Sequence, residues 1–223
     1  MALTRLPLGD EIANELRRRI LGGEYKPGDR LTEKGIAAEM GTSPGPVREA
    51  FAALSREGLL LSLPHRGTFV SPVSEQEARA AYDLRAWIEP FVMETVSHNT
   101  PPDLIQELHE KVAAMRTAHK KKDFPAMMAA DLAFHARLYE VAGGTVLAKI
   151  WKVIETATLK FAVIVAPHYY HHGEVTNTVE DHERLITLLL SGDTVALRQE
   201  SFRHLTDLWT RIEGPQSMPR ASN

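Results

Sequence analysis

The stretch TEKGIAAEMGTSPGPVREAFAALSREGLLLSLPHRGTFV, residues 32–70, decides the fold of the N-terminal part of this chain. Apolar residues recur at helical spacing on both sides of Gly41, which predicts two short helices joined by a tight turn. Two runs typical of strands follow at 59–63 and 68–71, with a glycine-bearing turn between them. This order predicts a helix-turn-helix followed by a β-hairpin.

The residues before this stretch add one more helix. An amphipathic pattern over residues 7–20 ends at two successive glycines. Thr32 can cap the second helix, and Thr42 or Ser43 can cap the third. Other small α/β domains show three helices and a hairpin, but the order and lengths here favour a winged helix.

The composition excludes several classes of protein. With 43% hydrophobic and 25% charged residues, the 223-residue chain is typical of an ordinary globular protein and not of a disordered or collagen-like one. It has no cysteine, which excludes disulfides and thiolate metal sites and agrees with a cytoplasmic location. We expect no membrane span and no secretion signal, because no apolar run reaches about 18 residues.

The remainder of the chain is predicted to be all-α, so that the fold as a whole is mainly α. Thr100 is the expected cap of one helix, with Pro101 as its first residue. His168, His171 and His172 are expected in a loop. The predicted helices are 75–98, 101–120, 124–142, 145–166, 177–191 and 194–213. The predicted organisation is a winged helix at 1–72, an all-helical domain at 75–214 and a disordered tail at 215–223.

A winged helix binds DNA by placing its third helix in the major groove. Arg48 lies in the first turns of that helix, on the face away from its apolar stripe, and can reach a phosphate or a guanine. An ion pair with Glu33 or Glu49 is the alternative interpretation. Hydroxyls beside the helix N-terminus and residues at the wing tip are further candidates for DNA contacts. These are Thr42, Ser43, His65, Arg66 and Gly67. The alternative for the wing-tip residues is that they are simply solvated.

Histidines mark the second half, which holds nine of the ten. Asp131 and His135 are four residues apart on one predicted helix, so both side chains leave the same face. His182 and His204 lie on two other predicted helices. Three imidazoles and one carboxylate suit Zn²⁺, with Ni²⁺, Mn²⁺ and Fe²⁺ as alternatives. The competing interpretation is that these are ordinary core or surface residues that do not meet. Sequence spacing alone does not show that side chains on three different helices lie close together.

The N-terminal part resembles the winged-helix module of GntR-family transcription regulators. The resemblance rests on PGDRL at 27–31, MGTS at 40–43, PVREA at 46–50 and RGTFV at 66–70. Members of that family usually have an arginine after the serine, where this chain has Pro44. Because proline donates no hydrogen bond, base reading is expected to shift to other residues. These are Arg30, Lys34, Arg48 and the wing.

The second half is similar to the FCD effector domain of the FadR-like GntR subgroup. The resemblance rests on YDLR at 82–85, DLAFH at 131–135, DHERL at 181–185 and HL at 204–205. It implies that Asp131, His135, His182 and His204 bind a metal ion. It also implies that Arg85 binds the carboxylate of a small effector, for which an ion pair with Asp83 or Glu89 is the alternative.

From these resemblances we expect a cytoplasmic homodimer that binds double-stranded operator DNA and senses a small organic acid. Two alternatives remain open at this stage. One is a metal-dependent enzyme that uses the three-histidine, one-aspartate site, and the other is a direct metal sensor. Repression is the expected outcome, although the sequence does not distinguish it from activation. It also does not identify the acid, the metal or the operator.

Overall fold

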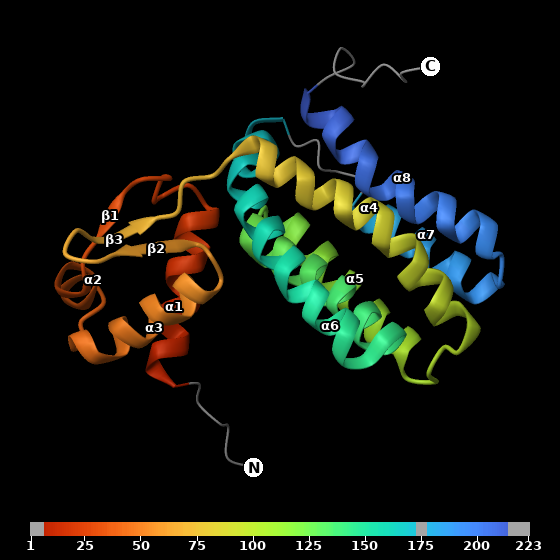
Figure 1. Ribbon diagram of the computed structural model, residues 1–223, viewed down its shortest axis with the longest axis horizontal. Coiled ribbons are helices and arrows are strands. Elements are labelled where there is room, and N and C mark those ends of the chain that lie inside the picture. Colours follow the sequence, from red (N-terminus) through yellow and green to blue (C-terminus); the bar gives the residue numbers. More distant parts are fainter. Residues whose placement is uncertain (1–6, 173–177, 214–223) are drawn as a thin grey trace.

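The computed structural model describes residues 7–172 and 178–213, and for 164–172 and 208–213 the backbone alone. The chain forms two parts side by side, a small α/β head and a larger helical domain (Figure 1). The tail expected at 215–223 lies outside the described residues. No helix in the described ranges is long and apolar enough to cross a membrane.

The head contains the three predicted helices and the predicted hairpin. Its elements are α1 (Leu8–Leu21), β1 (Arg30–Leu31), α2 (Glu33–Glu39), α3 (Pro44–Arg56), β2 (Leu60–Leu63) and β3 (Gly67–Val70). The sequence did not predict β1, which pairs antiparallel with β3 and completes the sheet order β1-β3-β2. Fully buried apolar residues of α1 and α3 form the core, among them Leu16, Ile20, Val47 and Leu54. The burial of these residues orients the opposite face of α3 toward solvent.

The helical domain consists of α4 (Glu75–His98), α5 (Leu104–Lys120), α6 (Phe124–His172), α7 (Thr178–Ser191) and α8 (Thr194–Glu213). In Figure 1, α4 lies between α6 and α8 while α5 packs against α6 and α7. Gly143 and Gly144 leave the helical conformation and divide α6 into two segments, at the break that the sequence predicts.

Two local predictions in this domain are wrong. The second predicted helix begins at Leu104 with Asp103 as its cap, not at Pro101 after Thr100. The reason is that Pro102 disfavours a helical conformation at the residue before it. The backbone of α6 is helical to His172, so His168, His171 and His172 do not lie in a loop. The helix continues through Pro167 although proline lacks a backbone donor and its ring crowds the preceding turn.

The head contacts the helical domain through α1 and the turn after α3, which pack against α6. The backbone of the head approaches α6 closely at Gly58, where an added Cβ would lie 2.8 Å from Thr156 Cγ2. Gly58 also has a φ of 72°, a conformation that other residues rarely adopt. The two parts therefore meet at a position suited to glycine.

Candidate metal centre and nucleic-acid interface

Four chain-distant side chains meet inside the helical domain. Asp131 and His135 come from the first segment of α6, His182 from α7 and His204 from α8. One ligand atom from each lies within 4.8 Å of the other three. The His182 Nε2 atom lies 3.2 Å from both His135 Nε2 and Asp131 Oδ1. The structure thus brings together the four residues expected to bind metal.

Neighbouring oxygen atoms orient two of these imidazoles. His182 Nδ1 lies 2.6 Å from the Thr178 carbonyl oxygen, so this nitrogen carries a hydrogen and donates it, and Nε2 faces the other ligand candidates. His135 Nδ1 lies 2.9 Å from Glu89 Oε2, which favours the same tautomer. Metal-binding histidines commonly have such partners on the second ring nitrogen. The sequence suggested Glu89 only as a partner of Arg85, and the structure places it against His135 as well.

The electrostatics keep these ligand groups in the states that bind metal. Burial lowers the pKa of His135, and it lowers the pKa of His204 to about 4, so both imidazoles are neutral at pH 7. Burial by itself would raise the pKa of Asp131. The hydrogen bond with His182 and the nearby His135 outweigh that effect and hold its pKa well below the ordinary value. His135 and His204 therefore present neutral nitrogens beside the anionic oxygen of Asp131.

This donor set fits a divalent transition metal. Imidazole and carboxylate ligands suit Zn²⁺ and its neighbours, whereas Ca²⁺ and Mg²⁺ prefer oxygen atoms alone. The burial of Asp131, His135 and His182, with His204 partly buried beside them, is a second point in favour, because clustered polar side chains in a core need polar or charged partners. The residues present fit the ion that the resemblance implies.

Arg85 lies in the core beside this centre, with 1% of its surface exposed. Its Nε donates to Glu89 Oε1 at 2.6 Å, which is the ion pair considered as the alternative to effector binding. The pair does not use the whole guanidinium, since Nη2 has no hydrogen-bond partner among the described residues. Glu89 thus contacts both Arg85 and the metal-ligand candidate His135.

On the head, Arg48 projects from α3 toward solvent as expected, and its side chain is 69% exposed. It forms a forked ion pair with Glu33 of α2, with Nη2 2.8 Å from Oε2. Ser43 occupies the cap position of α3, but its hydroxyl makes no capping hydrogen bond. The prediction of a side-chain cap at α3 is therefore wrong, and this hydroxyl is free to serve another acceptor or donor.

The remaining DNA-contact candidates form two groups. Lys34 lies on α2, and Thr42 lies in the turn before α3, the helix that carries Arg48. Arg30 lies on β1 next to Gly67, where an added Cβ would be 2.9 Å from Arg30 Nε. His65 and Arg66 form the exposed hairpin turn. The wing and the α2–α3 region thus present separate sets of cationic and hydroxyl side chains.

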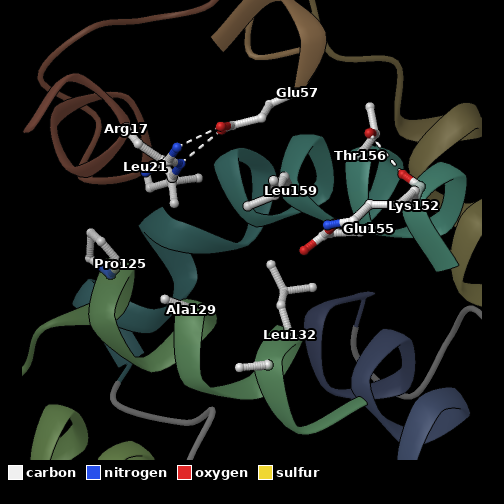
Figure 2. Close-up of a pocket in the computed structure, with 11 residues that line it drawn as sticks. Arg17, Leu21, Glu57, Pro125, Ala129, Leu132, Lys152, Glu155, Thr156 and Leu159 are labelled. Carbon is white, nitrogen blue, oxygen red and sulfur yellow. Dashed lines mark hydrogen bonds and ion pairs between the residues drawn. The ribbon is translucent and has the colours of Figure 1, made fainter. Parts of the chain in front are cut away.

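A cleft of about 300 Å³ separates the head from α6. Figure 2 shows Arg17 and Glu57 on the head side, joined by an ion pair of 2.6 Å, and Ala129 and Leu132 on the first segment of α6. Leu132 is the residue after the metal-ligand candidate Asp131. One turn of α6 therefore contacts the cleft on one side and the metal centre on another.

Comparison with protein families gives two matches. Residues 8–70 match the family described as bacterial regulatory proteins, gntR family, and residues 80–207 match the FCD domain. The second match covers more than half of the chain.

Individual relatives carry related descriptions. The chain is 26% identical over 215 residues to the "Gluconate operon transcriptional repressor" of Bacillus subtilis, covering 95% of this chain and 87% of the relative. It is 25% identical over 202 residues to the "HTH-type transcriptional repressor RspR" of Escherichia coli, covering 91% and 87%. The solved structure "E. coli McbR/YncC" has a TM-score of 0.72 at 21% identity, covering 94% and 98% of the two chains. That likeness concerns the fold.

Proposed function

The chain belongs to the gntR family of DNA-binding transcription regulators with an FCD domain, and from this premise we propose that a small carboxylate bound at a metal centre controls its affinity for operator DNA. The observation that carries the proposal is the convergence of Asp131, His135, His182 and His204 from three helices. Arg85, in the same buried region, supplies a cation with a free donor for the carboxylate.

Within the site, each residue has a separate task. Asp131, His135, His182 and His204 hold the ion, which would supply a Lewis-acidic position for an oxygen of the effector. Glu89 fixes the His135 tautomer through Nδ1 and anchors Arg85 through Nε. Nη2 of Arg85 then remains available to donate to an oxygen of a carboxylate.

The cleft gives a physical route from this site to the head. Ala129 and Leu132 line it from the first segment of α6, which also carries Asp131. Lys152 and Leu159 line it from the second segment. A shift of α6 on effector binding would change the surface against which Arg17 and Glu57 rest. In this scheme the effector favours one placement of the head, and DNA favours another.

The active species is proposed to be a homodimer, because a two-fold symmetric operator requires two heads. An exposed apolar stripe on α4 supports this, formed by Leu84, Trp87 and Phe91, with Phe202 of α8 beside it. Such patches are uncommon on monomers. Arg198 and Glu94 form an ion pair within the chain at its edge, so their charges are balanced beside the apolar stripe. A second copy of this chain is the proposed occupant.

The proposed outcome is repression in the cytoplasm, in line with the relatives named as repressors. The relatives are transcription regulators, which favours regulation over the metal-dependent enzyme considered from the sequence. For the head, the proposed DNA contacts are Arg30, Lys34, Thr42, Ser43, Arg48, His65, Arg66 and Gly67, as predicted.

The test is a titration of zinc-loaded protein with a duplex selected by this protein from a random library. Fluorescence anisotropy would measure duplex affinity with and without a panel of small carboxylates, gluconate among them. We expect one acid to change the affinity, and the duplex to change the affinity for that acid by the same factor. An equal affinity for every acid with and without duplex would contradict the coupling. Release of duplex by zinc alone would identify a metal sensor instead.

A further inference from the structure

Among the buried polar atoms that have no hydrogen-bond partner in the described residues, three belong to side chains next to the metal-ligand candidates. They are Nη2 of Arg85, the hydroxyl of Tyr139 and Nε1 of Trp151. None of these side chains is more than 2% exposed. Buried N–H and O–H groups in folded proteins almost always have a partner, because an unpaired group has lost its hydrogen bonds to water. Three such groups in one region indicate a place that is built for a polar molecule.

The three side chains lie next to one another. The Trp151 ring is 4.9 Å from the Tyr139 ring, 5.5 Å from Cζ of Arg85 and 6.1 Å from the ring of His135, between centroids. The indole therefore lies among a guanidinium, a phenol and a metal-ligand candidate. The pKa of Tyr139 is raised, first by burial and then by the charge of Glu89, so its hydroxyl keeps its proton and can donate.

The charges of the region favour a ligand with one negative charge. Arg85 and a divalent ion would bring three positive charges, and Glu89 and Asp131 bring two negative ones, which leaves an excess of one. A single carboxylate balances that excess. Tyr139 and Trp151 are neutral, so a second carboxylate beside them would be buried without a counter-charge.

The hydrogen-bonding types favour oxygen atoms over a hydrocarbon chain. An indole N–H only donates, while a phenol both donates and accepts. A hydroxyl oxygen can accept from either group, whereas a methylene group would leave both unpaired. The aromatic rings also provide an apolar surface for the carbon skeleton of a small acid.

We infer that Tyr139 and Trp151 select a hydroxylated monocarboxylate: Arg85 binds its carboxylate, and the phenol and the indole bind its hydroxyl oxygens. This inference rests on the proposed function and adds to it the class of effector and two residues that determine specificity. Neither residue was singled out by the sequence.

The experiment is calorimetric titration of zinc-loaded protein with acids matched in length. The six-carbon set is gluconate, hexanoate and adipate, and the three-carbon set is glycerate, propionate and malonate. In at least one set we expect the hydroxylated monocarboxylate to bind about tenfold more tightly than the other two, or better. Tyr139→Phe and Trp151→Phe should reduce this preference to about threefold or less, while the affinity for the plain acid and the zinc content stay unchanged.

Tyr25→Phe in the head is the matched control for Tyr139→Phe and should keep the full preference. Tyr139→Phe conserves the ring and so guards against misfolding, which thermal unfolding would reveal for Trp151→Phe. Equal affinities within both sets, or an equal loss for all acids in the two variants, would overturn the inference while metal-dependent binding of carboxylates still supported the proposed function. Binding of no acid, or binding unaffected by removal of zinc, would overturn the proposed function and the inference with it.

Discussion

The two parts of the molecule place their functional side chains in opposite environments. In the head, the core is apolar and Arg48 stands on the surface, paired with Glu33 in solvent. In the helical domain, charged side chains lie inside. Every buried charged side chain or histidine among the described residues belongs to it, namely Arg85, Glu89, Asp131, His135, Asp181, His182 and Glu200.

This difference follows from the kind of partner that each part is proposed to bind. A surface that meets a large polyanion needs mobile, solvated cations, because the partner supplies the counter-charge. A site for a small ligand must desolvate it, so its polar groups are oriented beforehand by partners such as Glu89 and the Thr178 carbonyl. The stability of the helical domain is therefore expected to depend on its ligands, and that of the head is not.

Removal of the metal is expected to have the largest effect, because it should destabilise the helical domain and leave the head unchanged. At ion concentrations about 1,000 times the Kd, binding stabilises the folded domain by about 4 kcal/mol. Chelation should then lower its thermal midpoint by roughly 10 °C, since about 1 kcal/mol corresponds to 2–4 °C in a chain of this size. Hydrogen exchange should show loss of protection in α6 to α8 and unchanged protection in α1 to α3. His135→Ala should abolish the response, and His109→Ala, on the exposed face of α5, should keep it.

The second test concerns self-association, which we assign to the helical domain. Trp87→Glu places a charge in the centre of the apolar stripe and should weaken dimers by about 2 kcal/mol or more, as for aromatic residues at interface centres. Analytical ultracentrifugation would measure this as a rise of roughly 30-fold in dimer Kd. Val146→Glu, at another exposed apolar position, is the control. A dimer equally stable in both variants would place the interface elsewhere.

Arg48→Ala is the corresponding test of the head. A side chain that binds a base or phosphate directly is worth about 1–3 kcal/mol, so operator affinity should fall by roughly 10-fold or more. Zinc content should not change, because Arg48 belongs to the other part. His135→Ala should do the reverse and lose zinc while duplex binding stays near normal. Identical losses in both variants would indicate general misfolding.

The smallest expected effect is that of a surface ion pair in the head. Hydrogen bonds from Arg18 and Arg19 lower the pKa of Glu15 to about 2. The stabilisation is therefore present above pH 4.5 and is lost as the pH falls toward 2. Because the Glu15 side chain is 36% exposed and its ion pairs are screened by solvent, Glu15→Gln should cost less than about 1 kcal/mol at neutral pH. Urea unfolding at pH 7 and at pH 2.5 would check that the difference between variant and parent shrinks in acid.

The contrast also explains how far the sequence could predict the structure. The head was predicted in detail because apolar spacing, Gly41 and the hairpin glycine act locally. Strand β1 was missed, since two residues make no pattern and its partner Phe69 is far along the chain. The Thr32 cap was expected and is present, with its hydroxyl accepting from Gly35 N–H at 3.1 Å.

For the metal centre, local spacing suggested only Asp131 and His135. His182 and His204 lie on other helices, and only the family resemblance connected them to this pair. The double role of Glu89 could not be predicted, because it depends on how α4 packs against α6. Tyr139 and Trp151 gave no signal for the same reason, since aromatic residues at helical spacing usually belong to an ordinary core.

The ion pair between Arg48 and Glu33 affects how the affinity of the head for nucleic acid depends on salt concentration. In the free protein Glu33 stands in for a phosphate, and the arginine must exchange one anion for another when duplex arrives. A carboxylate released in this way attracts a cation from solution, which offsets part of the counterion release that normally drives association. The logarithmic salt dependence of binding should accordingly be shallower than the number of phosphate contacts suggests. Glu33→Gln would make it steeper.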